Sequence, residues 1–118
     1  MSTHSTIHGL LNVVGVTGLV GTRIYHYEAL ETATAPYIVF DVVTESNHNL
    51  LDGGRVGRTI RASIRCFAVS ATAAEALGDA VETALKGSGY IVFRQTFRDA
   101  EAKLYWTQID WSARLAAA

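Results

Sequence analysis

The sequence has little cysteine and little net charge, and each scarcity excludes a class of protein. It contains one cysteine, Cys66, so an internal disulfide is impossible. Its 10 basic and 11 acidic residues give a formal net charge of −1, which leaves no global positive field to attract nucleic acid or an anionic membrane. No apolar run reaches the ~18 residues of a membrane span, and the N-terminus lacks the basic start of a secretory signal. We therefore expect a soluble protein made in the cytoplasm.

The composition is that of one packed domain. Hydrophobic residues make up 49% and charged residues 18% of the 118 residues, which is too apolar for a disordered chain. The length suits a single domain over residues 1–118 and leaves no room for a second. Cys66 falls on the apolar phase of an alternating segment, so we interpret it as a small buried hydrophobe.

Hydrophobic periodicity predicts two helices. The first lies near the N-terminus, where a helical stripe of Ile7, Leu10, Leu11 and Val14 follows the capping candidates Ser2, Thr3 and Ser5. The second lies within residues 70–89, where Thr72 and Glu75 have capping-box spacing, Leu77 and Val81 belong to one apolar stripe, and Gly87 is suited to ending the helix. We expect Leu77 and Val81 to share one core with Phe40, Ile64 and Trp111 of the strands. The segment between the first helix and Pro36 carries three glycines without a sustained period, so we expect a loop with a short extended piece at residues 23–27.

Four alternating runs predict strands. They occupy residues 36–46, 59–67, 89–99 and 102–115, and the first two are joined by an expected loop from about Thr44 to Arg58. Taken together, the elements predict an α+β domain. We expect an antiparallel sheet of about four main strands, with two helices packed on one face and the order α-β-β-α-β-β.

Alternation assigns each strand residue to a face of this sheet. The helix-facing side is expected to hold Ile38, Phe40, Val42, Ile60, Ala62, Ile64, Cys66, Ile91, Phe93, Phe97, Tyr105, Ile109 and Trp111. The opposite face is expected to mix Asp41, Glu45, Arg61, Arg65, Arg94, Arg98, Asp110 and Arg114 with Val39, Val43, Phe67, Tyr90, Val92 and Trp106. Such a mixture fits a wet protein interface, and it fits equally a solvated face with cross-strand ion pairs.

The stretch "DGGRVGRT" is the closest approach to a phosphate-binding loop, and its chemistry argues against one. A P-loop reads GxxxxGK[ST] and opens a helix, whereas Asp52 stands at the first glycine, Arg58 at the lysine, and a strand pattern follows. The four histidines lack partners that would complete a metal site, although His4 and His8 are one helical turn apart. The basic-aromatic signature of an RNA-binding sheet is absent as well. We predict neither an enzyme nor a cofactor.

Three stretches together resemble a known family: "LVGTRIYHYEALETATAPYIVFDVV", "LDGGRVGRTIRASIRCFAVSATAAEALGDAVETAL" and "YWTQIDWSARL". Their order and spacing, from about Leu19 to Leu115, are similar to the tail-terminator, or tail-completion, proteins of long-tailed phages and gene transfer agents. The helix start "SATAAEAL" is richer in alanine than is typical of that family, which concerns helix packing more than function.

The resemblance implies a virion structural protein that is assembled in the host cytoplasm and located at the head-proximal end of the tail. Such a protein forms a ring, usually a hexamer, that closes the tail tube and offers a surface to the head connector, or neck protein, while DNA passes through it. The implied partners are further copies of the chain, the tail tube protein and the head connector, with no membrane and no specific nucleic acid. We expect the interface to use Asp52, Arg55, Arg58, Arg61 and Arg65. The alternative is a small α+β ligand-binding or regulatory module without a virion role.

Overall fold

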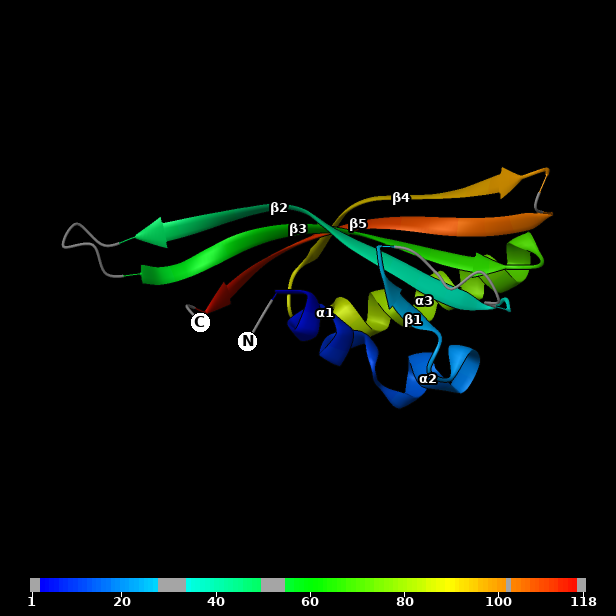
Figure 1. Ribbon diagram of the computed structural model, residues 1–118, viewed down its shortest axis with the longest axis horizontal. Coiled ribbons are helices and arrows are strands. Elements are labelled where there is room, and N and C mark those ends of the chain that lie inside the picture. The colour runs from blue at the N-terminus through cyan, green and yellow to red at the C-terminus, as the bar shows by residue number, and fades with distance from the viewer. Residues whose placement is uncertain (1–2, 28–33, 50–54, 102, 117–118) are drawn as a thin grey trace.

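The computed structural model describes residues 3–27, 34–49, 55–101 and 103–116, which form one sheet and three helices (Figure 1). The elements in chain order are α1 (Thr3–Leu11), α2 (Val14–Val20), β1 (Ile24–His26), β2 (Tyr37–Asn49), β3 (Arg55–Ala68), α3 (Ala71–Leu85), β4 (Tyr90–Asp99) and β5 (Leu104–Ala116). The α+β class and the four long strands are confirmed. The order α-β-β-α-β-β omits one helix and one strand.

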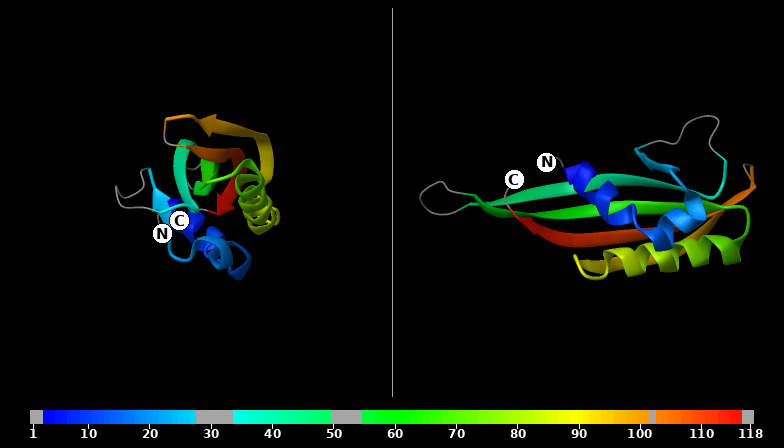
Figure 2. Two further views of the ribbon diagram at one scale, coloured as in Figure 1. Left: turned by 90° about the vertical axis from the view of Figure 1, so that its right-hand side faces the viewer. Right: turned by 90° about the horizontal axis from the view of Figure 1, so that it is seen from below.

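The sheet has five strands in the order β1-β2-β3-β5-β4, and it is mixed. β1 pairs with β2 in parallel, while all other neighbours are antiparallel. The prediction of a purely antiparallel sheet is therefore wrong, because the short edge strand β1 is parallel to its neighbour. The extended piece predicted at residues 23–27 is confirmed as β1. The three helices cover one face of the sheet, and the other face carries no helix among the described residues (Figure 2).

The N-terminal helical region is two helices where one was predicted. The chain breaks after α1, where Val13 adopts an extended conformation with φ −123° and ψ 155° and precedes α2. Ile7 and Leu11 are fully buried, as their spacing predicted, but Val14 lies past the break and is 88% exposed. Helical spacing did not reveal α2, because its sequence VGVTGLV holds two glycines, which are poor helix formers.

α3 begins two residues earlier than a capping box at Thr72 would place it. The hydroxyl of Ser70 accepts a hydrogen bond from the backbone N–H of Ala73 at 3.1 Å, so Ser70 is the N-cap and Thr72 lies inside the helix. The apolar stripe of α3 packs on the sheet. The predicted common core of Phe40, Ile64, Leu77, Val81 and Trp111 is confirmed, since all belong to one buried cluster.

Two β-bulges change the faces that alternation assigned. A register shift between Val42 and Thr44 places Glu45 opposite Ile60, on the helix side. A second shift between Ile91 and Phe93 has the same effect on β4. Four assignments on β4 were consequently wrong: Arg94 and Arg98 face the helix side, and Phe93 and Phe97 the free side.

β2 and β3 form a longer hairpin than predicted. Paired residues run to Asn49 on β2 and start at Arg55 on β3, so most of the expected loop from Thr44 to Arg58 is strand. Residues 50–54 lie outside the described residues. The end of this hairpin projects past the helices (Figure 1) and contributes to an elongated subunit of 53 × 24 × 24 Å. We call this projecting part, Thr44–Asn49 with Arg55–Thr59, the arm.

Candidate interaction surfaces

Five aromatic rings form a row on the helix-free face. Tyr37 stacks on Phe67 with ring centroids 4.9 Å apart, Phe67 lies 5.8 Å from Trp106, and Trp106 stacks on Phe97 at 5.3 Å. Tyr25 of β1 meets the Tyr37 ring edge-on at 6.2 Å. The row therefore crosses all five strands, and we call it the aromatic row. Each ring is only partly buried, so together they form a continuous apolar surface.

The row occupies one end of the free face, away from the arm. Tyr37 begins β2, Phe97 lies near the end of β4 and Trp106 near the start of β5, which is the end opposite the arm (Figure 1). Burial, and secondarily the neighbouring Tyr25, raises the pKa of Tyr37 above its ordinary value.

An ion pair lies on the same face, next to the row. Arg65 Nη2 donates to Asp41 Oδ2 at 2.8 Å, and it lies 3.5 Å from the backbone carbonyl oxygen of Tyr27. Both side chains are partly buried, with 32% of Arg65 and 25% of Asp41 exposed. Arg65, a predicted interface residue, therefore already has a carboxylate partner within its own chain.

Arg58, another predicted interface residue, lies on the helix side. It is an even-numbered residue of β3, in phase with the buried Ile60, and its side chain is only 5% exposed. Its Nε contacts Glu45 Oε1 at 2.8 Å. The register shift at Val43 brings this carboxylate to the helix side, so the bulge supplies the partner that a buried guanidinium needs.

The other predicted interface residues differ in what the structure says of them. Arg61 is exposed on the free face, opposite Thr44 and Ser112, and no described residue forms an ion pair or hydrogen bond with it. Arg55 begins β3, and only its backbone is described. Asp52 lies outside the described residues. Arg58, Arg61 and Arg65 therefore do not form one cluster, because Arg58 points to the opposite face.

Sequence reasoning placed Arg94 outward, and the structure gives it a different role. Its guanidinium contacts Asp79 Oδ1 at 2.7 Å and Glu82 Oε2 at 3.1 Å, and it donates to the carbonyl of Glu75 at 3.1 Å. Burial lowers the pKa of Arg94, but the hydrogen bond to Asp79 and the negative charges of Asp79 and Glu82 raise it, and the net result is a pKa above the ordinary value. Arg94 thus fixes edge strand β4 to α3.

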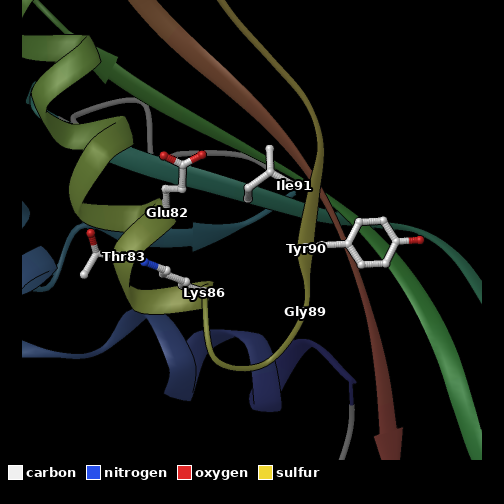
Figure 3. A pocket seen from close by; sticks show the side chains of 6 residues that line it. All are labelled: Glu82, Thr83, Lys86, Gly89, Tyr90 and Ile91. Atoms are coloured by element: carbon white, nitrogen blue, oxygen red, sulfur yellow. The ribbon is translucent and has the colours of Figure 1, made fainter.

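A pocket of about 370 Å³ lies between the C-terminal part of α3 and the start of β4 (Figure 3). Glu82, Thr83, Lys86, Gly89, Tyr90 and Ile91 line it. The Ile91 side chain points toward α3, whereas the Tyr90 ring points away from the pocket (Figure 3). The carboxylate of Glu82 is already bound by Arg94, so it is part of the contact that fixes β4 to α3.

Within the described ranges, no group of three or more His, Cys, Asp or Glu side chains is arranged to hold a metal ion. In that same part of the chain, no helix combines the length and the apolar character that a membrane span requires. Cys66 is fully buried, and burial raises the pKa of its thiol to about 12. Its interpretation as a core residue is confirmed.

The sequence did not predict that the five rings of the aromatic row lie together. Phe67 and Trp106 were assigned to the free face, but nothing in the spacing showed that they neighbour Tyr37 and Phe97. The available signal was an aromatic residue near the same end of each strand. Reading that signal required the strand order and register, which place Phe67 opposite Tyr37 and Trp106 opposite Phe97.

The fold is similar to that of a chain in the structure of the virion of a native gene transfer agent particle. The TM-score is 0.73 at 17% sequence identity, and the likeness covers 98% of this chain and 96% of that one. At this identity the likeness establishes the fold. None of the curated proteins matches the sequence.

Residues 7–116 match the tail completion protein gp17 family. This match defines the class of the chain, which is a virion tail protein. The chain belongs to the tail completion protein gp17 family. The resemblance seen in the sequence is thereby confirmed, and the chain is a structural protein of the virion tail.

Proposed function

We propose that copies of this chain form a hexameric ring that closes the head-proximal end of a tail tube and presents the surface joined by the head connector. Family membership over residues 7–116 is the observation that carries this proposal. The shape supports it, since an elongated subunit with a helix-free face and a projecting arm has two surfaces available to neighbours (Figure 1). The chain acts by assembly.

The arginines of the free face and the arm form contacts between neighbouring copies in the ring, or contacts between the ring and the tail tube protein. Arg61 is the leading member, because it is exposed and has no partner among the described residues. A guanidinium binds a partner carboxylate bidentately and stacks on aromatic rings, so it suits a polar contact that forms only on assembly. Asp52, Arg55, Arg58 and Arg65 complete the proposed set, although Arg58 and Arg65 would have to keep or exchange their internal carboxylates.

The proposal is tested by assembly of the purified chain, alone and with tail tubes. Electron microscopy and analytical ultracentrifugation are expected to show closed rings, and rings are expected at one end of each tube. Particles made without this protein are expected to have tails that lack a finished end and fail to join heads. A monomer or dimer that binds no tube would overturn the proposal. It would favour a small-molecule module, for which the pocket between α3 and β4 is the place to look.

A further inference from the structure

A second apolar surface lies on the opposite side of the molecule from the aromatic row. Residues 9–22 contain no charged side chain. Within them Val13, Val14 and Leu19 are 41%, 88% and 45% exposed, whereas Val16 and Val20 are fully buried against the core. We call the exposed side of this segment the α2 patch. It lies outermost on the helix side, toward the same end of the long axis as the aromatic row (Figures 1 and 2).

Two glycines of α2 have no packing reason among the described residues. Gly15 and Gly18 are exposed, and a Cβ added to either would meet nothing within 4 Å. Glycine inside a helix is less favourable than alanine, so the presence of both residues weakens α2. Where they stand, the helix backbone is bare and open to close approach from outside. A flat aromatic ring is well suited to lie against such a surface.

We propose that the aromatic row of one copy binds the α2 patch of the next copy. This inference rests on the proposed ring, and it identifies the surfaces that build it. Both surfaces are built mainly from apolar side chains, so each is complementary to the other in chemistry. Arg65 and Asp99 are charged neighbours of the row, since the charges of both act on Tyr37. The neighbouring Arg65 and Asp41 neutralise each other at 2.8 Å, which leaves no net charge beside the row from this pair.

The placement of the two surfaces selects a repeated contact over a symmetric dimer. A two-fold dimer formed through either surface would leave the other exposed in both copies. A contact between unlike surfaces covers both, and repetition joins copy to copy. Because the row and the α2 patch lie toward the same end of the long axis, neighbouring copies need little shift along that axis, which suits a closed ring whose axis runs parallel to it.

Cysteine cross-linking of two single variants tests the contact. Val14→Cys places a thiol in the α2 patch, and Phe97→Cys places one at the end of the aromatic row. Cys66 is fully buried and remains unreactive. In an oxidised mixture of the two variants, we expect disulfides between Val14→Cys and Phe97→Cys chains to exceed the disulfide-linked homodimers of either variant several-fold. The double variant is expected to give a ladder of cross-linked copies. If Phe97→Cys does not fold, Tyr25→Cys at the other end of the row replaces it.

Val92→Cys is the matched control, because Val92 is 44% exposed on the same strand as Phe97 but outside the row. It is expected to form few mixed disulfides with Val14→Cys. Rings in the electron microscope with only homodimeric cross-links, or with none, would overturn this contact and leave the proposed function standing. Mixed cross-links in open filaments would support the contact and contradict the ring. A chain that never self-associates, with or without tail tubes, would overturn both.

Discussion

Trp111 and Trp106 lie on the same strand, β5, and belong to opposite faces of the sheet. Trp111 is fully buried among aliphatic side chains under the helices, whereas Trp106 is partly exposed between Phe67 and Phe97. One alternating sequence thus supplies both a core and a surface row. The helix side therefore forms the hydrophobic core, whereas the free side leaves large rings partly exposed to solvent.

The largest loss of stability is expected from truncation of Trp111. Trp111→Ala is expected to lower the free energy of unfolding by about 3–5 kcal/mol, because it removes a fully buried ring and leaves a cavity. Trp106→Ala is the matched change on the other face, and we expect it to cost about 1 kcal/mol. Urea unfolding of both variants measures the difference. Equal losses would show that the free face is as much a core as the helix side.

A substitution at Gly89 tests how tightly the residues on the helix side are packed. A Cβ at this position would lie 2.3 Å from the backbone carbonyl oxygen of Ser112 and 2.7 Å from Trp111 Nε1. Gly89→Ala is therefore expected to cost about 1–3 kcal/mol through overpacking. Gly87→Ala is the control, since its Cβ would meet nothing within 4 Å, and it is expected to stay within about 0.5 kcal/mol of the parent. Thermal unfolding of the pair decides the point, and similar melting temperatures would contradict it.

The pH dependence of the stability tests whether the Cys66 thiol is buried on the helix side. The thiol pKa rises from 9.0 to about 12 on folding, because burial disfavours the thiolate. The folded state then holds this proton more tightly than the unfolded state between these two values. The contribution of Cys66 to stability is complete below pH 9 and falls as the pH rises toward about 12. Cys66→Ala is expected to remove that part of the pH dependence.

The reactivity of the same thiol offers a simpler measurement. Iodoacetamide at pH 8 is expected to leave the native chain unmodified and to alkylate it fully in denaturant, as mass spectrometry would show. Rapid alkylation of the native protein would mean that the helix side opens more readily than its packing indicates.

The smallest effect on folding is expected at Arg61, on the free face. Arg61→Glu removes no described ion pair or hydrogen bond, so its free energy of unfolding is expected to stay within about 0.5 kcal/mol of the parent. Assembly is expected to be lost all the same. Lys86→Glu, a charge reversal at the exposed end of α3, is the control and is expected to assemble normally. Light scattering and tube-capping assays compare them, and normal assembly of Arg61→Glu would leave that arginine as a solvated side chain.

Much of this fold followed from local patterns. Alternation located the four long strands, and the stripe containing Leu77 and Val81 located α3, because both patterns have strong periods. α2 was missed, since a short helix with Gly15 and Gly18 has no such signal. Of the predicted interface residues, only Arg61 is shown exposed without a described partner. The pairing of Arg58 and Arg65 with carboxylates depends on contacts between strands that spacing alone does not specify.

The sequence by itself determined the α+β class, the core residues of β3 and α3, and the family to which the chain belongs. Only the tertiary structure decided which side chains share a face beyond each bulge. A bulge adds one residue to one strand, and because side chains alternate with a period of two, every later residue on that strand changes side. The shift near Val92 turned Arg94 toward α3 and Phe97 toward Trp106. The aromatic row gains its last ring, Phe97, through that shift, and this ring could be placed only once the register was known.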